Sequence, residues 1–234
     1  MIEELVARLV EKVDHRFYGI YRALVVDNDD PDKRGRLKVK VPGVLGNEVV
    51  LGWALPCAPY GGAADHGFFF IPELDSEVWV EFESGSLDYP VWVGSCWAKP
   101  GGNSEPPKPN GVDGKEESDV QSPPTRKIIK TLKGHTIQLE DADDGELVML
   151  FEAKNGNLIV MNADGIKITE SRNKTTITLN DSGLKIEAAK DIELKADGAI
   201  KITAAKDIEL KADGDIKMDA ANVKVTVSGK MDVN

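Results

Sequence analysis

The spacing of hydrophobic residues changes along the chain and predicts different structures in its successive segments. In residues 1–16, hydrophobic side chains recur three and four positions apart between charged ones, which is typical of an amphipathic helix. Residues 17–97 contain short β-rich runs separated by Pro, Gly and Asp clusters. These runs span residues 20–26, 36–41, 49–55, 67–71, 77–82 and 91–97. Runs of this length and spacing predict a small antiparallel barrel or sandwich.

The next segment, residues 98–126, holds half of the chain's 12 prolines and almost no large hydrophobic side chain. This composition predicts a linker that is semi-extended rather than folded. No proline follows Pro124, so every later residue is able to donate a hydrogen bond to a β-ladder. We therefore expect residues 127–234 to form uninterrupted sheet.

An eight-residue repeat, the octad, dominates the C-terminal segment. The sequence AAKDIELKADG occurs at residues 188–198 and again, without a change, at residues 204–214. From Leu184 onward, the first and third positions of each octad are hydrophobic, the fifth is Ala, and the second and fourth are charged or polar. Because side chains alternate along a strand, each octad predicts a short strand with one hydrophobic face, followed by a turn. Weaker copies precede the octads at residues 158–162, 166–170 and 175–179.

Nothing else in the sequence is available to cover the hydrophobic faces of the octads in a single chain. We expect three copies to wrap around one axis, each strand pairing with a strand of a neighbouring subunit, so that no edge stays free. A single-chain solenoid is the alternative, although solenoids generally use about 20 or more residues per turn. The predicted trimer core consists of Leu184, Ile186, Ala188, Ile192, Leu194, Ala196, Ile200, Ile202, Ala204, Ile208, Leu210, Ala212, Ile216, Met218 and Ala220. The predicted spike tip consists of Val223, Val225, Val227, Met231 and Val233.

Charge and cysteine content narrow the possible partners. The chain has 29 basic and 40 acidic residues, a net charge of -11, which repels phosphate backbones and argues against a nucleic-acid partner. Cys57 and Cys96 lack CxxC spacing, so we expect reduced, buried thiols rather than a disulfide framework or a four-ligand zinc site. The sequence shows no signal peptide and no apolar run of 18 residues, which favours synthesis in the cytoplasm.

No motif predicts a catalytic residue, a cofactor site or a metal site. Residues 27–35 and 141–152 carry acids spaced partly like those of a calcium loop, but neither stretch has Gly at the sixth position, so we interpret both as turns. His15, His66 and His135 lie in different sequence contexts without a nucleophile-elbow motif nearby. The four tryptophans of the barrel could stack on bases, but the acidity of the chain favours a core or partner-contact role.

Three segments carry a resemblance to a known family. Residues 20–43 contain a strand, an Asp-Pro turn and the strand GRLKVKVP, residues 58–97 end in PVWVGSCW, and residues 132–146 begin LKGHTI. In this order they resemble baseplate assembly protein V of contractile-tailed phages and the related spike proteins of type VI secretion and phage-tail-like injection systems. The resemblance implies an all-β fold, with an N-terminal oligonucleotide/oligosaccharide-binding (OB-fold) barrel followed by a C-terminal intertwined trimeric β-helix spike.

The resemblance also implies a mechanical function. The chain would be the homotrimeric central spike of a baseplate, assembled into a phage tail or an injection particle and driven through the target cell envelope by sheath contraction. The barrel end would contact the tail hub or tube protein. Relatives with a lysozyme domain or with iron-binding histidines at the tip differ from this chain, whose last histidine is His135. We therefore expect no catalysis and no metal, and a separate small protein as a cap on the tip.

Other function classes remain open at this stage. Paired carboxylates among the 40 acidic residues would suit a glycan-binding or glycan-hydrolysing trimeric tail spike. A nucleic-acid-binding OB protein with a trimerising tail would need a basic groove, and a passive fibre or adhesin would leave the barrel unexplained.

Overall fold

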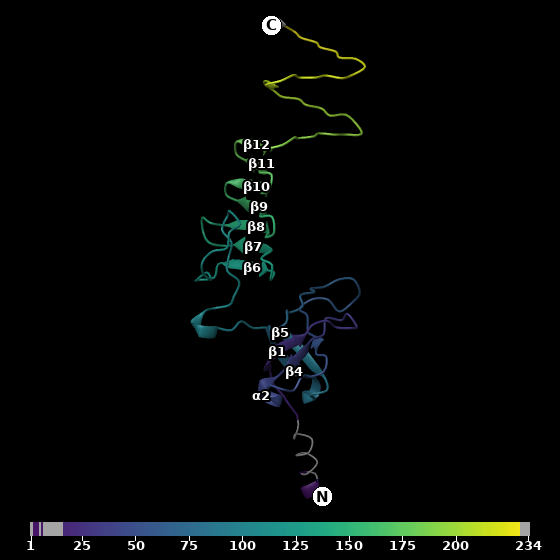
Figure 1. Ribbon diagram of the computed structural model, residues 1–234, viewed down its shortest axis with the longest axis vertical. Helices are drawn as coiled ribbons and strands as arrows, with labels where there is room; N and C mark the ends of the chain where they lie inside the picture. Colours follow the sequence, from purple (N-terminus) through teal and green to yellow (C-terminus); the bar gives the residue numbers. More distant parts are fainter. Residues whose placement is uncertain (1, 5, 7–15, 230–234) are drawn as a thin grey trace. The chain divides into compact units, whose positions relative to one another are not determined.

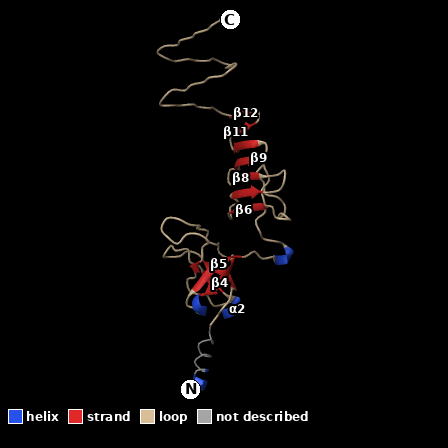
Figure 2. Ribbon diagram, turned by 180° about the vertical axis from the view of Figure 1, so that it is seen from behind, coloured by secondary structure: helices blue, strands red, loops and turns tan. Residues whose placement is uncertain are grey.

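The computed structural model describes residues 2–4, 6 and 16–229. The strands gather in two separate groups, drawn in red in Figure 2. Residues 2–4 and 6 are helical and Arg16 is not, and the other residues of the predicted N-terminal helix lie outside the described residues. Within the described ranges, no helix has the length and apolarity needed to cross a membrane.

The first group is a five-stranded sheet with the order β2-β1-β4-β5-β3. Its strands are β1 (Tyr21–Asp27), β2 (Lys38–Lys40), β3 (Leu55–Pro56), β4 (Glu77–Phe82) and β5 (Pro90–Ser95), with the short helix α2 (Pro42–Leu45) after β2. All pairs are antiparallel except β3 with β5. Alternate residues supply the core, because Val25, Val39, Val78 and Val80 are fully buried. The predicted run at 77–82 coincides with β4.

Two predicted strands of this region are mostly loop. In residues 49–55 the structure has only the start of β3 and isolated bridges from Val50 and Ala54. Residues 67–71 form no strand, and Phe68 makes a single backbone bond of 3.0 Å to the carbonyl of Tyr60. Several glycines nearby, including Gly67 with a φ of 139°, have positive φ angles, which interrupt an extended ladder.

The second group is a seven-stranded sheet in which each strand pairs with the next along the chain. It appears as the teal-to-green ladder in Figure 1. Its strands are β6 (Arg126–Lys130), β7 (Thr136–Glu140), β8 (Leu147–Glu152), β9 (Asn157–Asn162), β10 (Gly165–Glu170), β11 (Thr175–Asn180) and β12 (Gly183–Glu187). All six pairings are antiparallel. Gly165 and Gly183 adopt positive φ angles at two of its turns, which suits tight hairpins.

Part of the predicted linker is folded, which corrects the expectation of a semi-extended segment. Pro109 and Asn110 are buried. The backbone N–H of Glu117 donates to the carbonyl of Pro109 at 2.9 Å, and Asn110 bridges to Glu116. The segment folds because it covers one face of the seven-stranded sheet, and its own composition does not reveal this partner.

The seven-stranded sheet, β6 to β12, is called the neck below. Most octads differ from the neck in that their described residues form no strand within the single chain. The first octad, with Leu184 and Ile186, forms β12 and pairs with β11 of the same chain, whereas we had expected each octad to pair with another subunit. A hairpin with Gly183 at a positive φ makes this pairing possible. Among the described residues 188–229 there is no strand, and bends recur at 189–190, 197–198, 205–206 and 213–214. The chain thus bends with the eight-residue period of the sequence.

Candidate functional site

One face of the seven-stranded sheet is mostly hydrophobic. Residues directly opposite each other in the strand register point to the same face. On one face this register aligns Ile129, Ile137, Leu139, Val148, Leu150, Ile159, Met161, Ile166, Ile168, Ile177, Leu179, Leu184 and Ile186. We call this set the apolar face. Within it, Leu150 is 44% exposed and Ile186 is 47% exposed, and an uncovered surface of this extent marks an interaction site.

The octads carry exposed hydrophobic side chains like those of the apolar face. Ile192, Ile200 and Ile208, at the first positions of successive octads, are 56%, 54% and 53% exposed. The third-position residues are also exposed. A single chain therefore leaves the predicted trimer core open to solvent, and the free energy of burying it, about 1.5–3 kcal/mol for each large side chain, is available to association.

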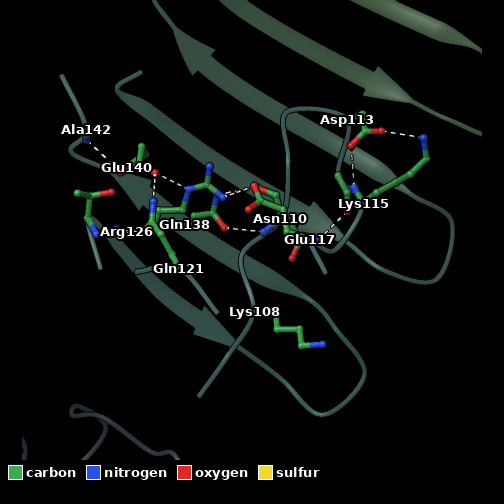
Figure 3. A network of polar contacts seen from close by, with 12 residues as sticks. Lys108, Asn110, Asp113, Lys115, Glu117, Gln121, Arg126, Gln138, Glu140 and Ala142 are labelled. Carbon is green, nitrogen blue, oxygen red and sulfur yellow. Dashed lines mark hydrogen bonds and ion pairs between the residues drawn. The ribbon is translucent and has the colours of Figure 1, made fainter. Parts of the chain in front are cut away.

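The opposite face of the neck carries mostly polar residues on β6 and β7 and a buried hydrophobic cluster of Leu147, Met149, Leu158 and Val160 on β8 and β9. The folded linker covers this face at β6–β9. We call residues 108–121 the strap. Figure 3 shows its central contact, in which the backbone N–H of Asn110 donates to Gln138 Oε1 at 2.9 Å and Gln138 Nε2 donates to the Asn110 carbonyl at 2.8 Å. Gln138 is fully buried, so both bonds stand in a site that excludes water, where each unmade bond is costly.

A buried carboxylate fixes one end of the strap. Glu140, 5% exposed, accepts bonds from Arg126 Nε and, at 3.0 Å each, from Gln121 Nε2 and the backbone N–H of Ala142. Arg126 also pairs with Glu117 of the strap. Burial alone would raise the pKa of Glu140, but these hydrogen bonds outweigh it and lower the pKa to about 2. The network keeps Glu140 charged at neutral pH (Figure 3).

A lysine fixes the strap at a second point. Lys130 Nζ donates to the carbonyl of Lys108 at 2.9 Å, to Asn110 Oδ1 at 3.0 Å and to Glu116 Oε2 at 2.5 Å. The hydrogen bond from Lys130 lowers the pKa of Glu116. Arg126 and Lys130, two basic residues at the start of the neck, therefore bind the strap of their own chain.

In the acidic turn of the barrel, the central carboxylate is bonded to groups of its own chain. Asp30, 7% exposed, accepts from Arg36 Nη2 at 2.6 Å and from the backbone N–H of Arg34 at 2.8 Å. The Arg36 hydrogen bond lowers the pKa of Asp30 well below its ordinary value. The carboxylate thus acts as the centre of a turn, as we interpreted this stretch from the sequence.

The structure places the other candidate residues apart. Within the described ranges, no three His, Cys, Asp or Glu side chains are grouped so that they could hold a metal ion. Of the predicted tip, Val223, Val225 and Val227 are exposed, whereas Met231 and Val233 lie outside the described residues. Cys57 is an exposed free cysteine, in contrast to the buried thiol that we expected.

Sequence reasoning missed two parts of this site. The contribution of β6, β7 and β8 to the apolar face, for example Ile137 and Leu150, was not predicted. Its signal was present as the alternation in TIQLE and the continuous hydrophobic run in LVMLFE. The covering of the opposite face by the strap left no local signal, since it depends on Gln138 meeting Asn110 across 28 positions.

Comparison with known families agrees with this geometry. Residues 21–97 match the type VI secretion system/phage-baseplate injector OB domain. Residues 127–182 match the phage baseplate V C-terminal trimerisation domain, which covers β6 to β11 and hence most of the apolar face. No curated protein matches the chain. With an injector OB domain followed by a trimerisation domain, together more than half of its 234 residues, this chain belongs to the baseplate spike family of phage tails and type VI secretion systems.

Proposed function

We propose that the chain is the central spike that joins the hub or tube of a contractile baseplate to its tip and pierces the target envelope on sheath contraction. The observation that carries this proposal is the apolar face, which runs through all seven strands of the neck and continues in the exposed octads. Three such faces turned to a common axis would bury one another and leave charged positions outside. A shaft of this kind is stiff because every strand is held on both edges.

The proposal includes partners and place of action. The barrel contacts the hub or tube protein, a small separate protein caps the C-terminal end, and the chain is made in the cytoplasm before it joins the virion or particle. The chain itself performs no catalysis. The strap supports the mechanical role, because its contacts with Gln138, Glu140 and Lys130 tie the linker to the base of the shaft, where force would enter.

The first test is the mass of the full chain in solution by light scattering, and its resistance to unheated detergent. Three chains of 25.4 kDa predict a species of about 76 kDa that withstands detergent. A monomer would overturn the proposal.

The mechanical role is tested in particles. Particles that carry the chain without residues 188–234 should assemble and contract but fail to release dye from target cells, whereas particles with the full chain release it. Unchanged dye release by the truncated particles would contradict piercing. Release of reducing sugar from a bacterial surface glycan by the purified chain would contradict a purely mechanical role.

A further inference from the structure

The octads carry an alternation of charge beside their hydrophobic residues. In the order of the chain, the second positions are Lys185, Glu193, Lys201, Glu209 and Lys217. The fourth positions are Glu187, Lys195, Thr203, Lys211 and Asp219. In extended chain these positions lie on the face opposite to the hydrophobic ones. The sign of charge thus reverses with each octad in the first series, and Thr203 is the one uncharged member of the second.

This order of charges disfavours hairpins between successive octads. Folding one octad back on the next, as the neck strands do, would align Lys185 with Lys195 and Glu187 with Glu193, so that like charges stand opposite each other. The later octads would repeat the conflict, for example with Lys201 opposite Lys211. Like charges directly opposite each other destabilise a sheet.

The neck itself avoids such conflicts. In its antiparallel register, Lys167 stands opposite Thr178 and Val160, and Lys185 stands opposite Thr178. Glu187 likewise faces Thr176. The charges of the neck therefore suit hairpins, and those of the octads do not.

A parallel arrangement with an offset of one octad removes every conflict. It aligns Lys185 with Glu193, Glu193 with Lys201, and Glu187 with Lys195. Every pair of charges that meets in this register is of opposite sign, and the remaining pairs contain Thr203. Parallel strands with no offset would place each charge against its own copy, and an offset of two octads would again align like charges.

The backbone of the octads fits this arrangement. Gly165 and Gly183 take positive φ angles at hairpin turns of the neck, whereas Gly198 and Gly214 do not. The chain bends at 197–198 and 213–214, and no backbone hydrogen bond joins residues 188–229 to another described residue. The described octad residues beyond β12 thus form no hairpin ladder, and their backbone groups are open to a second chain.

We propose that the alternating charges at the second and fourth octad positions set the register of the shaft: each octad pairs in parallel with the next octad of a second copy of this chain. In a three-fold shaft this offset places residue 193 of each chain beside residue 201 of a neighbour. The inference rests on the trimeric shaft proposed above, and adds the residues that select its strand direction and offset.

Disulfide trapping tests the register in the full chain with Cys57→Ser and Cys96→Ser as background. In the double variant E193C/K201C, mild oxidation should link three chains into a covalent trimer of about 76 kDa, since adjacent strands bring paired Cβ atoms within disulfide range. The single variant E193C and the two-octad variant E193C/E209C should stay unlinked. The variant K185C/K195C reports the hairpin alternative and should also stay unlinked.

Light scattering on the same variants separates the two proposals. If the protein is a trimer but E193C/K201C forms no disulfide between chains, the charge register is overturned and the spike proposal stands. The same holds if a trimer of E193C alone or of E193C/E209C forms a disulfide between chains. A monomer with an internal bond in K185C/K195C overturns both.

A charge exchange provides a second test without cysteines. The variant E193K/K195E keeps composition and net charge, but places like charges opposite each other in the parallel register and unlike charges in the hairpin register. We expect its trimer to dissociate at lower temperature than the wild type, with the difference shrinking in 1 M salt because salt screens exposed charges. The control K206D/D207K exchanges the same kinds of charge at a bend. A trimer of E193K/K195E as stable as that of the control would overturn the inference.

Discussion

At the scale of single residues, buried ions hold both folded regions together. Asp30 in the barrel and Glu140 in the neck are each nearly inaccessible and each accept several bonds, including one from an arginine. Removing one partner of a buried pair leaves the other uncompensated, which is more costly than the net contribution of the pair. These residues therefore matter for stability.

Glu140→Gln should destabilise the neck and alter its response to acid. The loss of a charged acceptor for Arg126 predicts a decrease of about 1–3 kcal/mol in the free energy of unfolding at pH 7. The pKa of Glu140 is about 2 in the folded chain, against an ordinary value of 4.5. Its stabilisation is therefore present above about pH 4.5 and is lost as the pH falls toward 2.

Denaturation curves at pH 7 and pH 3 check this prediction. The stability difference between the wild type and Glu140→Gln should be smaller at pH 3. Glu146→Gln, at an exposed position, is the matched control and should leave both curves unchanged. An equal difference at the two pH values would show that the charge of Glu140 is not the cause.

At the scale of elements, the two faces of the neck have different partners. The face that carries Gln138 and Lys130 is covered by the strap of the same chain, and the apolar face is open in the single chain. The alternation of each strand makes this division possible, because neighbouring residues point to opposite sides. The strap thereby leaves the hydrophobic side free for association.

Gln138→Leu should release the strap while the strands remain paired. The leucine leaves the N–H and the carbonyl of Asn110 without partners in a buried site, each at a cost of about 1–3 kcal/mol. Hydrogen exchange should increase at residues 108–121 more than in β9–β11. Thr178→Val, on the same face of a strand outside the strap contact, serves as control. Exchange that rises equally throughout the neck would mean that the strap is not a separable element.

At the scale of the whole molecule, assembly supplies what the single chain lacks. The barrel has a buried core of its own, whereas the octads expose nearly all of their large hydrophobic side chains. The chain accordingly divides at residue 190 into two compact units, of which the second has no strand among its described residues. Its stability must therefore depend on other copies of the chain.

Ile168→Asp should prevent trimer formation, because it would place three carboxylates on the apolar faces that meet in the trimer. Its sequence neighbour Lys167 points to the opposite face, so Lys167→Asp is a closely matched control. Light scattering should give about 25 kDa for the first variant and about 76 kDa for the second. A trimer for Ile168→Asp would exclude this face from the interface.

The sequence by itself determined the all-β class, the division into barrel and shaft, and the octad period, because these follow from local alternation and composition. It also contained the charge order of the octads, since that order is a property of the chain before any folding. Only the tertiary structure decided the rest. Whether residues 49–55 and 67–71 pair and how Gln138 binds the strap depend on which segment each one meets, which local patterns do not specify. The first octad joins β11 through a hairpin, a choice of partner that its own alternation leaves open.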